Sequence, residues 1–596
     1  MDSWPRLTER GRGFFGKGGT GMNVHKKEVI RLLETIALYM EMKGENPFKI
    51  NAFRKAANAL ETDERSLAEI SDFTAIPGIG KSTAAIITEF VETGSSSVLE
   101  ELKRDIPETL LALLKIPGLG GKKIAKLHQE LGIVDMDGLK EACLAGKVRE
   151  LPGFGAKTEE KLLAAIEEAA KRPERLPLAK VLAVAADVER QLACLDGVIR
   201  FSRAGSLRRL KETVKDLDYV IATDRPAAVR DGLLRFDRVR EVIAAGETKV
   251  SLLFQYDDEI AIDFRLVGET EFATALHHFT GSKEHNVRMR QLAKERGEKI
   301  SEYGVEDQAT GEVKTFPNEA AFYAHFGLPY IPPELREDGT EVERFSADRP
   351  LVRLEDIQGD LHMHSAWSDG ACSLEELAEA CRRRGYRYIA ITDHSRYLKV
   401  ANGLTPERLR RQREEIERLN ARYSDLTILA GVEMDILPDG TLDYDDDVLQ
   451  ELDFVIAAIH SGFKQPREQI MKRLEAALRH PYVDVIAHPT GRLIGRRDGY
   501  DVDVERLIEL AAETNTVLEI NANPNRLDLA AAYVKKAEEA GAYIAINTDA
   551  HHLDMLDDMA IGVATARKGW LKKETVINTW PLEKLQQFLR DKRSKT

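Results

Sequence analysis

Hydrophobic and polar positions follow three patterns along the chain. Before residue 176 the apolar residues recur at helical spacing, starting at Met22. Between residues 176 and 330, strand-like runs such as 217–223 are interspersed with helical stretches. From residue 356 on, apolar β-rich runs alternate with amphipathic helices, which is typical of a parallel α/β sheet or barrel. At 596 residues, several domains are expected.

The patterns predict a helical region, an α+β core and a C-terminal α/β barrel. The segment 331–355 is rich in proline and charge and predicts a linker. Residues 1–21 contain six glycines within 11–21 and no periodicity. We expect this leader to be non-native, with translation starting at Met22. The predicted domains are 22–100, 101–175, 176–330 and 356–596.

Composition argues against a membrane-spanning protein and against a thiolate zinc protein. No apolar run approaches the length of a membrane span, and there is no signal-peptide core. Four scattered cysteines without a CxxC pair fit a reducing cytoplasm and disfavour a thiolate zinc site. The net charge is −14, but the first half is nearly neutral and the acidity lies in the second half. Local basic patches therefore remain compatible with DNA binding.

Three similar stretches lie in the helical region, at 76–87, 116–127 and 151–162. Each reads apolar-Pro-Gly-apolar-Gly and then begins a helix. Such a turn brings free backbone N–H groups at a helix start close to an anion, so each could hold one DNA phosphate. One copy could be a plain turn between helices, but three copies favour phosphate binding. The glycines concerned are Gly78, Gly80, Gly118, Gly120, Gly153 and Gly155, and upstream cations Lys49 and Arg54 could join them.

Three aspartates predict a metal site in the core. Asp216 and Asp218 lie on one strand-like run and point the same way, and Asp263 lies in another such run. Together they can hold two Mg²⁺ ions that activate a 3′-hydroxyl and stabilise leaving pyrophosphate. Gly205, Ser206, Arg208 and Arg209 precede them and suit a triphosphate. Acidic pairs at strand ends are common. The prediction therefore depends on the whole arrangement: a Gly-Ser pair, then two aspartates on one strand, then a third aspartate on another strand.

Metal-binding side chains recur at the ends of the strands in the last third. His362 and His364 flank one methionine and share a face if the stretch is extended. A single such pair could arise by chance in a surface loop. In a barrel, however, the carboxyl ends of the strands meet at one face, so distant residues converge there. The nine candidate ligands are His362, His364, Asp369, His394, Glu433, His460, His488, Asp549 and His551. Nine ligands suit two or three ions, and mixed imidazole and carboxylate sets suit Mn²⁺, Zn²⁺ or Fe²⁺.

These motifs together resemble the bacterial family X DNA polymerases. The repeats resemble helix-hairpin-helix motifs, the aspartates resemble the nucleotidyltransferase pattern, and the nine ligands resemble a PHP phosphoesterase domain, expected to be a distorted seven-stranded β/α barrel. The resemblance implies that Phe279, Gly281, Asn286 and Arg290 contact the incoming nucleotide. His278 replaces the family's tyrosine at the sugar edge.

The same resemblance places Ile86 where a Schiff-base lysine removes 5′-deoxyribose phosphate in relatives. An aliphatic side chain cannot form a Schiff base, so this lyase activity is not expected.

The resemblance implies template-directed filling of short gaps in DNA repair, as in base excision repair, and a Mn²⁺- or Zn²⁺-dependent 3′–5′ exonuclease. We expect gapped or nicked duplex DNA and dNTPs as partners, a monomer, and no membrane. Alternatives are an abasic-site endonuclease or a small-molecule phosphatase in the barrel, and a non-catalytic scaffold for DNA ends. The arginines of 491–499 could contact a phosphate backbone or could simply be solvated.

Overall fold

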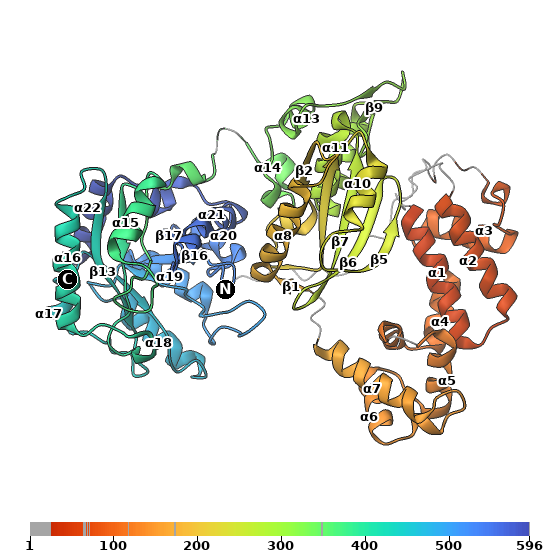
Figure 1. Cartoon of the computed structure of the whole chain (residues 1–596), viewed down its shortest axis with the longest axis horizontal. Coiled ribbons are helices and arrows are strands. Elements are labelled where there is room, and N and C mark those ends of the chain that lie inside the picture. The colour runs from red at the N-terminus through yellow and green to blue at the C-terminus, as the bar shows by residue number, and fades with distance from the viewer. Residues whose placement is uncertain are drawn as a thin grey trace, which may run out of the picture. The chain divides into compact units, whose positions relative to one another are not determined.

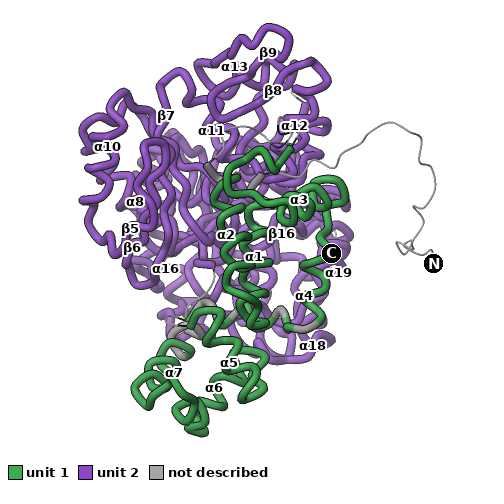
Figure 2. The backbone as a smooth tube through the Cα atoms, turned by 90° about the vertical axis from the view of Figure 1, so that its right-hand side faces the viewer, with its two compact units in different colours: residues 1–173 green, residues 174–596 purple. Residues whose placement is uncertain are grey.

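The computed structural model describes residues 26–62, 67, 70, 72–116, 119–171, 175–346, 348 and 350–594. The chain forms two compact units, residues 1–173 and 174–596, coloured separately in Figure 2. The predicted leader, 1–21, and Gly118 lie outside the described residues.

The first unit is helical and has one hydrophobic core. That core runs from Val29 to Ile166, so both predicted helical segments contribute to it. In two of the predicted phosphate-binding turns, the second glycine comes directly before a helix, as predicted. These residues are Gly80 and Gly120. Ile86 packs against the core. The α-helices are α1 (Lys26–Lys43), α2 (Pro47–Thr62), α3 (Lys81–Thr93), α4 (Ser97–Asp105), α5 (Gly121–Leu131), α6 (Met136–Leu144) and α7 (Ala156–Lys171).

The second unit begins with a five-stranded mixed sheet, which we call the palm (Figure 1). Its strand order is β2-β4-β7-β6-β5, and only β4 and β7 run parallel. The strands are β2 (Arg200–Arg203), β4 (Asp216–Ala222), β5 (Val239–Ala245), β6 (Lys249–Gln255) and β7 (Glu259–Val267). The palm also has a short pair, β1 (Leu176–Pro177) with β3 (Thr213–Val214), and helices α8 (Leu178–Ala193), α9 (Gly205–Arg208) and α10 (Pro226–Leu233).

The thumb follows the palm and extends further than predicted. Its core includes Leu335 and Val342, and Arg336 and Glu341 are buried beside it. The first part of the segment predicted as a linker is therefore packed into the thumb, because its apolar side chains find partners there. The thumb contains α11 (Phe272–Thr280), α12 (Lys283–Glu295), β8 (Glu298–Ile300), β9 (Val305–Asp307), β10 (Val313–Lys314), α13 (Glu319–His325) and α14 (Glu341–Arg344).

The last part is a seven-stranded, all-parallel sheet in sequential order, the predicted β/α barrel. Its ends approach each other, because Met363 and Ala550 form a parallel bridge between the segments after the first and last strands. The strands are β11 (Gly359–Asp360), β12 (Tyr388–Ile391), β13 (Thr427–Asp435), β14 (Phe454–Ala458), β15 (Val485–Ile486), β16 (Val517–Asn521) and β17 (Ile544–Asn547). The helices are α15 (Leu374–Arg383), α16 (Pro406–Asn420), α17 (Asp446–Leu449), α18 (Arg467–Leu478), α19 (Val504–Thr514), α20 (Ala531–Ala540), α21 (Met559–Lys568) and α22 (Leu582–Arg593).

This architecture confirms the predicted fold class: a helical region, an α+β core and a C-terminal (β/α)7 barrel. Among the residues that the structure describes, no helix is both long and apolar enough to cross a membrane.

Two candidate catalytic centres

The palm aspartates lie together on two neighbouring strands. Asp218 on β4 is directly opposite Asp263 on β7 in the parallel register, and Asp216 is two residues earlier on the same face. Burial, together with the nearby charges of Asp216 and Asp263, raises the pKa of Asp218 to about 7. Lys249 Nζ lies 2.6 Å from Asp263 Oδ2, a neighbour that the sequence patterns did not reveal. Three crowded carboxylates, one of them with a raised pKa, fit a site for divalent cations.

Gly205 packs directly against one of these carboxylates. Its φ of +56° lies in the left-handed region, and a Cβ there would be 2.0 Å from Asp218 Oδ2. Glycine is therefore required at this position, both for the backbone conformation and for the close approach. Ser206 follows Gly205 in α9, so the segment predicted to bind the triphosphate lies beside the aspartates.

The two arginines that follow Ser206 and Leu207 both bind residues of the thumb. Arg208 forms a bidentate ion pair with Glu319 of the thumb, and its Nη2 lies 2.6 Å from Glu319 Oε2. Arg209 donates to the carbonyl oxygen of Thr280 at 2.8 Å and lies 3.3 Å from Glu337. Arg208 also donates to Thr280 Oγ1 at 2.8 Å, so both arginines join the palm to the thumb beside the turn predicted to hold the sugar.

That turn connects α11 to α12. Asn286 Nδ2 donates to the carbonyl oxygen of His278 at 2.8 Å, which closes the turn around Gly281. Phe279 stacks under the Arg265 guanidinium, 4.6 Å from the ring centre. Arg290 lies one turn beyond Asn286 on the same face of α12, where burial lowers its pKa.

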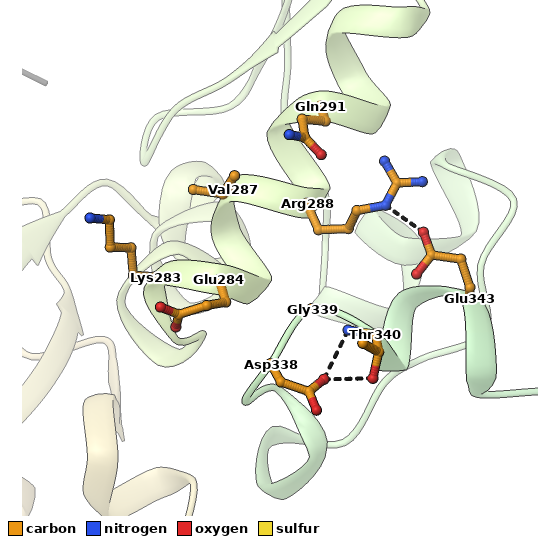
Figure 3. A pocket seen from close by; sticks show the side chains of 9 residues that line it. All are labelled: Lys283, Glu284, Val287, Arg288, Gln291, Asp338, Gly339, Thr340 and Glu343. Carbon is orange, nitrogen blue, oxygen red and sulfur yellow. Dashed lines mark hydrogen bonds and ion pairs between the residues drawn. The ribbon is translucent and has the colours of Figure 1, made fainter. Parts of the chain in front are cut away.

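A cleft of about 400 Å³ lies on another face of α12 (Figure 3). Lys283, Val287 and Gln291 line it from the helix, with Asp338, Gly339, Thr340 and Glu343 opposite. Asn286 and Arg290 are not among its lining residues. The cleft is therefore distinct from the predicted nucleotide site.

The nine predicted barrel ligands converge at one end of the strands. Groups of side-chain atoms within 4.8 Å of one another could each hold an ion. The groups are His364, Asp369, His394 and His551; His362, His364 and Asp549; and His394, Glu433 and His460. His488 joins them through Glu433, with 2.9 Å between Nε2 and Oε1. Three groups that share members fit a cluster of two or three metal ions.

The cluster is buried except on one side. His362 and His364 are fully buried, whereas the Asp369 and His551 side chains are 35% and 27% exposed. Burial disfavours the charged forms of Asp369 and His551. The hydrogen bond between the two side chains and the charges around them have the larger effect on both pKa values. The pKa of Asp369 falls to about 2 and that of His551 rises to about 9. A substrate could therefore reach the cluster on the side of these two residues.

Two carboxylates missed by the sequence patterns orient the ligands. Glu519 on β16 accepts from His362 Nδ1 at 2.7 Å and from the backbone N–H of His488 at 2.7 Å. Asp435 on β13 lies 3.1 Å from His460 Nδ1. Such partners fix the imidazole tautomer that binds a metal. The only signal in the sequence was a charged residue inside an apolar strand.

Several predicted DNA contacts are paired in the structure. Lys49 lies 3.4 Å from Glu45 and Arg54 lies 2.5 Å from Glu41, all exposed or half-buried. In the barrel loop 491–499, Arg492 is bound to Glu212 of the palm.

Gly78 and Gly153 have positive φ, as tight turns require. Gly155 directly precedes α7.

Fold and sites together define a nucleotidyltransferase core joined to a metal-binding barrel. The DNA polymerase beta thumb family matches residues 275–337, and the PHP domain family matches 360–523. A helix-hairpin-helix domain matches 24–96, and a SAM-like helix-hairpin-helix tandem matches 110–168.

Relatives cover either the whole chain or the barrel. The "DNA polymerase/3'-5' exonuclease PolX" of Bacillus subtilis (strain 168) is 61% identical over 95% of this chain and 100% of its own length. Probable phosphatases of Thermoanaerobacter sp. (strain X514) and Caldanaerobacter subterraneus are each 29% identical over 40% of this chain, covering 96% and 92% of their own lengths. The chain belongs to the bacterial family X DNA polymerases that carry a C-terminal PHP domain.

Proposed function

We propose that this chain is a DNA-directed DNA polymerase that fills short gaps during DNA repair and carries a separate 3′–5′ exonuclease in its PHP barrel. The observation that carries the proposal is the presence of two distinct clusters of candidate metal ligands in one chain, three aspartates in the palm and nine histidines and carboxylates in the barrel. The relative in Bacillus subtilis bears both activities in its name.

In the palm, Asp216, Asp218 and Asp263 would hold two Mg²⁺ ions. When bound, such ions neutralise phosphate charge and favour the ionised form of an attacking oxygen. Arg209 and the N–H groups around Ser206 would hold the triphosphate of an incoming dNTP. Gly281 and Asn286 would set the position of its sugar.

In the barrel, the nine ligands would hold two or three ions, with Mn²⁺ or Zn²⁺ favoured by the imidazole-rich set. Glu519 and Asp435 would keep the imidazoles in the tautomer that binds metal. The exposed side at Asp369 and His551 would admit a 3′ end. Gapped or nicked duplex DNA is the proposed substrate, held by the helix-hairpin-helix turns, and the chain would act as a monomer.

The test is a one-nucleotide-gapped duplex labelled at the 5′ end of the primer, incubated with Mn²⁺ with and without dNTPs. The double variant Asp216→Ala/Asp218→Ala should lose extension but retain shortening. The variant His362→Ala/His364→Ala should lose shortening but retain extension. Shortening that survives loss of the histidines would refute the barrel as the nuclease, and extension that survives loss of the aspartates would refute the palm as the polymerase.

A second candidate for the barrel is a small-molecule phosphatase, favoured by its similarity to the probable phosphatases. Comparing hydrolysis of a phosphomonoester with hydrolysis of a 3′-terminal DNA diester distinguishes the two. A duplex with a single abasic site tests endonuclease activity in the same experiment.

A further inference from the structure

We propose that the PHP barrel positions the nucleotide-binding loop of the polymerase, with Lys568 and Arg492 as positioning residues for DNA synthesis. This inference rests on the proposed polymerase function. It concerns residues 209–215, which we call the grip loop. The grip loop connects α9, which carries Gly205 and Ser206, to Asp216 at the start of β4.

The grip loop contains a strained residue. Leu210 has a φ of +50°, a left-handed conformation that is strained for a residue with a Cβ. Such a conformation persists only when its surroundings hold it. Arg209, which we propose binds the triphosphate, is the adjacent residue, so the backbone at Leu210 helps to set its position.

Lys568 of α21 in the barrel holds this residue directly. Its Nζ donates to the carbonyl oxygen of Leu210 at 2.9 Å. The Lys568 side chain is only 14% exposed, and burial lowers its pKa to about 8. Glu337, 3.9 Å from Lys568 Nζ, also lies 3.3 Å from Arg209 and 2.7 Å from Lys211. One barrel lysine therefore lies among the side chains that flank the proposed triphosphate contact.

Arg492 holds the other part of the grip loop. Its guanidinium makes a bidentate ion pair with Glu212, with nitrogen–oxygen distances of 2.8 and 3.1 Å. The same guanidinium donates to the backbone carbonyls of Arg526 and Leu527 in the barrel. Because Arg492 is bound on both sides, it holds Glu212 at a defined distance from the barrel.

Apolar packing adds to the contact between the barrel and the palm. Ile494 and Leu527 of the barrel belong to the same hydrophobic core as Leu207 and Val214 of the palm. The backbone at Gly495 also packs against the Pro177 ring. Leu207, just before the grip loop, and Val214, within it, thus share one core with the barrel, and a polar and an apolar contact act on the same short segment.

The experiment measures single-nucleotide insertion in Mg²⁺ with the full chain and a gapped duplex. Lys568→Met and Glu212→Gln should each raise the KM for dNTP about tenfold or more, because the nucleotide contact shifts while the aspartates remain. Lys568→Arg, which can still donate to the Leu210 carbonyl, should recover most of the loss. Shortening of the primer by Glu212→Gln should equal that of the wild type.

Lys592→Met is the matched control. Lys592 is a similarly buried lysine whose pKa burial lowers to about 8, and it donates to Val483 and Thr516 inside the barrel. It should leave the KM for dNTP unchanged. The inference would be overturned if Lys592→Met raised the KM for dNTP as much as Lys568→Met does. It would also be overturned if either Lys568→Met or Glu212→Gln left this KM unchanged. A wild-type chain that inserts no dNTP would instead refute the proposed polymerase function.

Discussion

Replacing Gly205 by alanine should disable DNA synthesis through a contact with a single carboxylate. The new Cβ would lie 2.0 Å from Asp218 Oδ2 and 2.9 Å from its carboxyl carbon, against an ordinary contact distance of about 3.5 Å or more. The Asp218 carboxylate must therefore move by about 1 Å or more, and a misplacement of that size at a reacting centre costs about 100-fold in rate.

The backbone adds a separate effect. Alanine at a φ of +56° costs about 1–2 kcal/mol of stability, because its Cβ approaches the following carbonyl oxygen. Gly297→Ala is the matched control, since Gly297 also has positive φ, +71°, but has no atom within 4 Å of a Cβ. Both variants should lose similar stability, and only Gly205→Ala should lose synthesis.

The assay is single-turnover insertion into a one-nucleotide gap at saturating dNTP, with thermal unfolding measured in parallel. The insertion rate of Gly205→Ala should fall about 100-fold, while that of Gly297→Ala stays within about twofold of the wild type. A Gly205→Ala chain that inserts nucleotides within about threefold of the wild-type rate would refute the assigned role of Asp218.

Three further predictions follow from buried charges. Glu519→Gln should raise the Mn²⁺ concentration needed for primer shortening about 10- to 100-fold and leave extension unchanged, because the imidazole loses its orienting carboxylate; a metal titration with an unchanged midpoint would contradict this role. The raised pKa of Asp218, about 7, means that the folded, metal-free chain keeps a proton that it must lose to bind Mg²⁺, so the half-saturating Mg²⁺ for synthesis should rise as pH falls below 7; equal values at pH 6 and pH 8 would argue against it. Glu319→Gln leaves the fully buried Arg336 and the half-buried Arg208 without a carboxylate and should lower the free energy of unfolding by about 3–5 kcal/mol in denaturant titrations; a loss below about 1 kcal/mol would show that neither arginine depends on Glu319 for charge compensation.

Much of the candidate site was predictable because it depends on local spacing. Side chains two residues apart on a strand share a face, so Asp216 and Asp218 had to point together. The carboxyl ends of parallel strands meet at one face, so ligands as distant as His362 and His551 had to converge once a barrel formed. The fold class followed from the same periodicities.

Other features depended on partners far along the chain, which spacing does not reveal. A strand that is buried on both faces shows no alternation of apolar and polar residues, so its sequence does not mark which side chains point into the barrel. Glu519 was missed for this reason. Arg492 looked like a phosphate contact but pairs with Glu212, 280 residues away. Part of the expected linker became thumb core because its apolar residues were buried there.

Periodicity and spacing along the chain were enough to predict the order of the domains, the three aspartates and the nine candidate ligands, because backbone geometry acts locally. The ion pairs, and the contact of the barrel's Lys568 with the Leu210 carbonyl, become apparent only in the folded chain. The physical reason is that burial and ion pairing depend on packing between segments hundreds of residues apart, and that packing has no period along the chain.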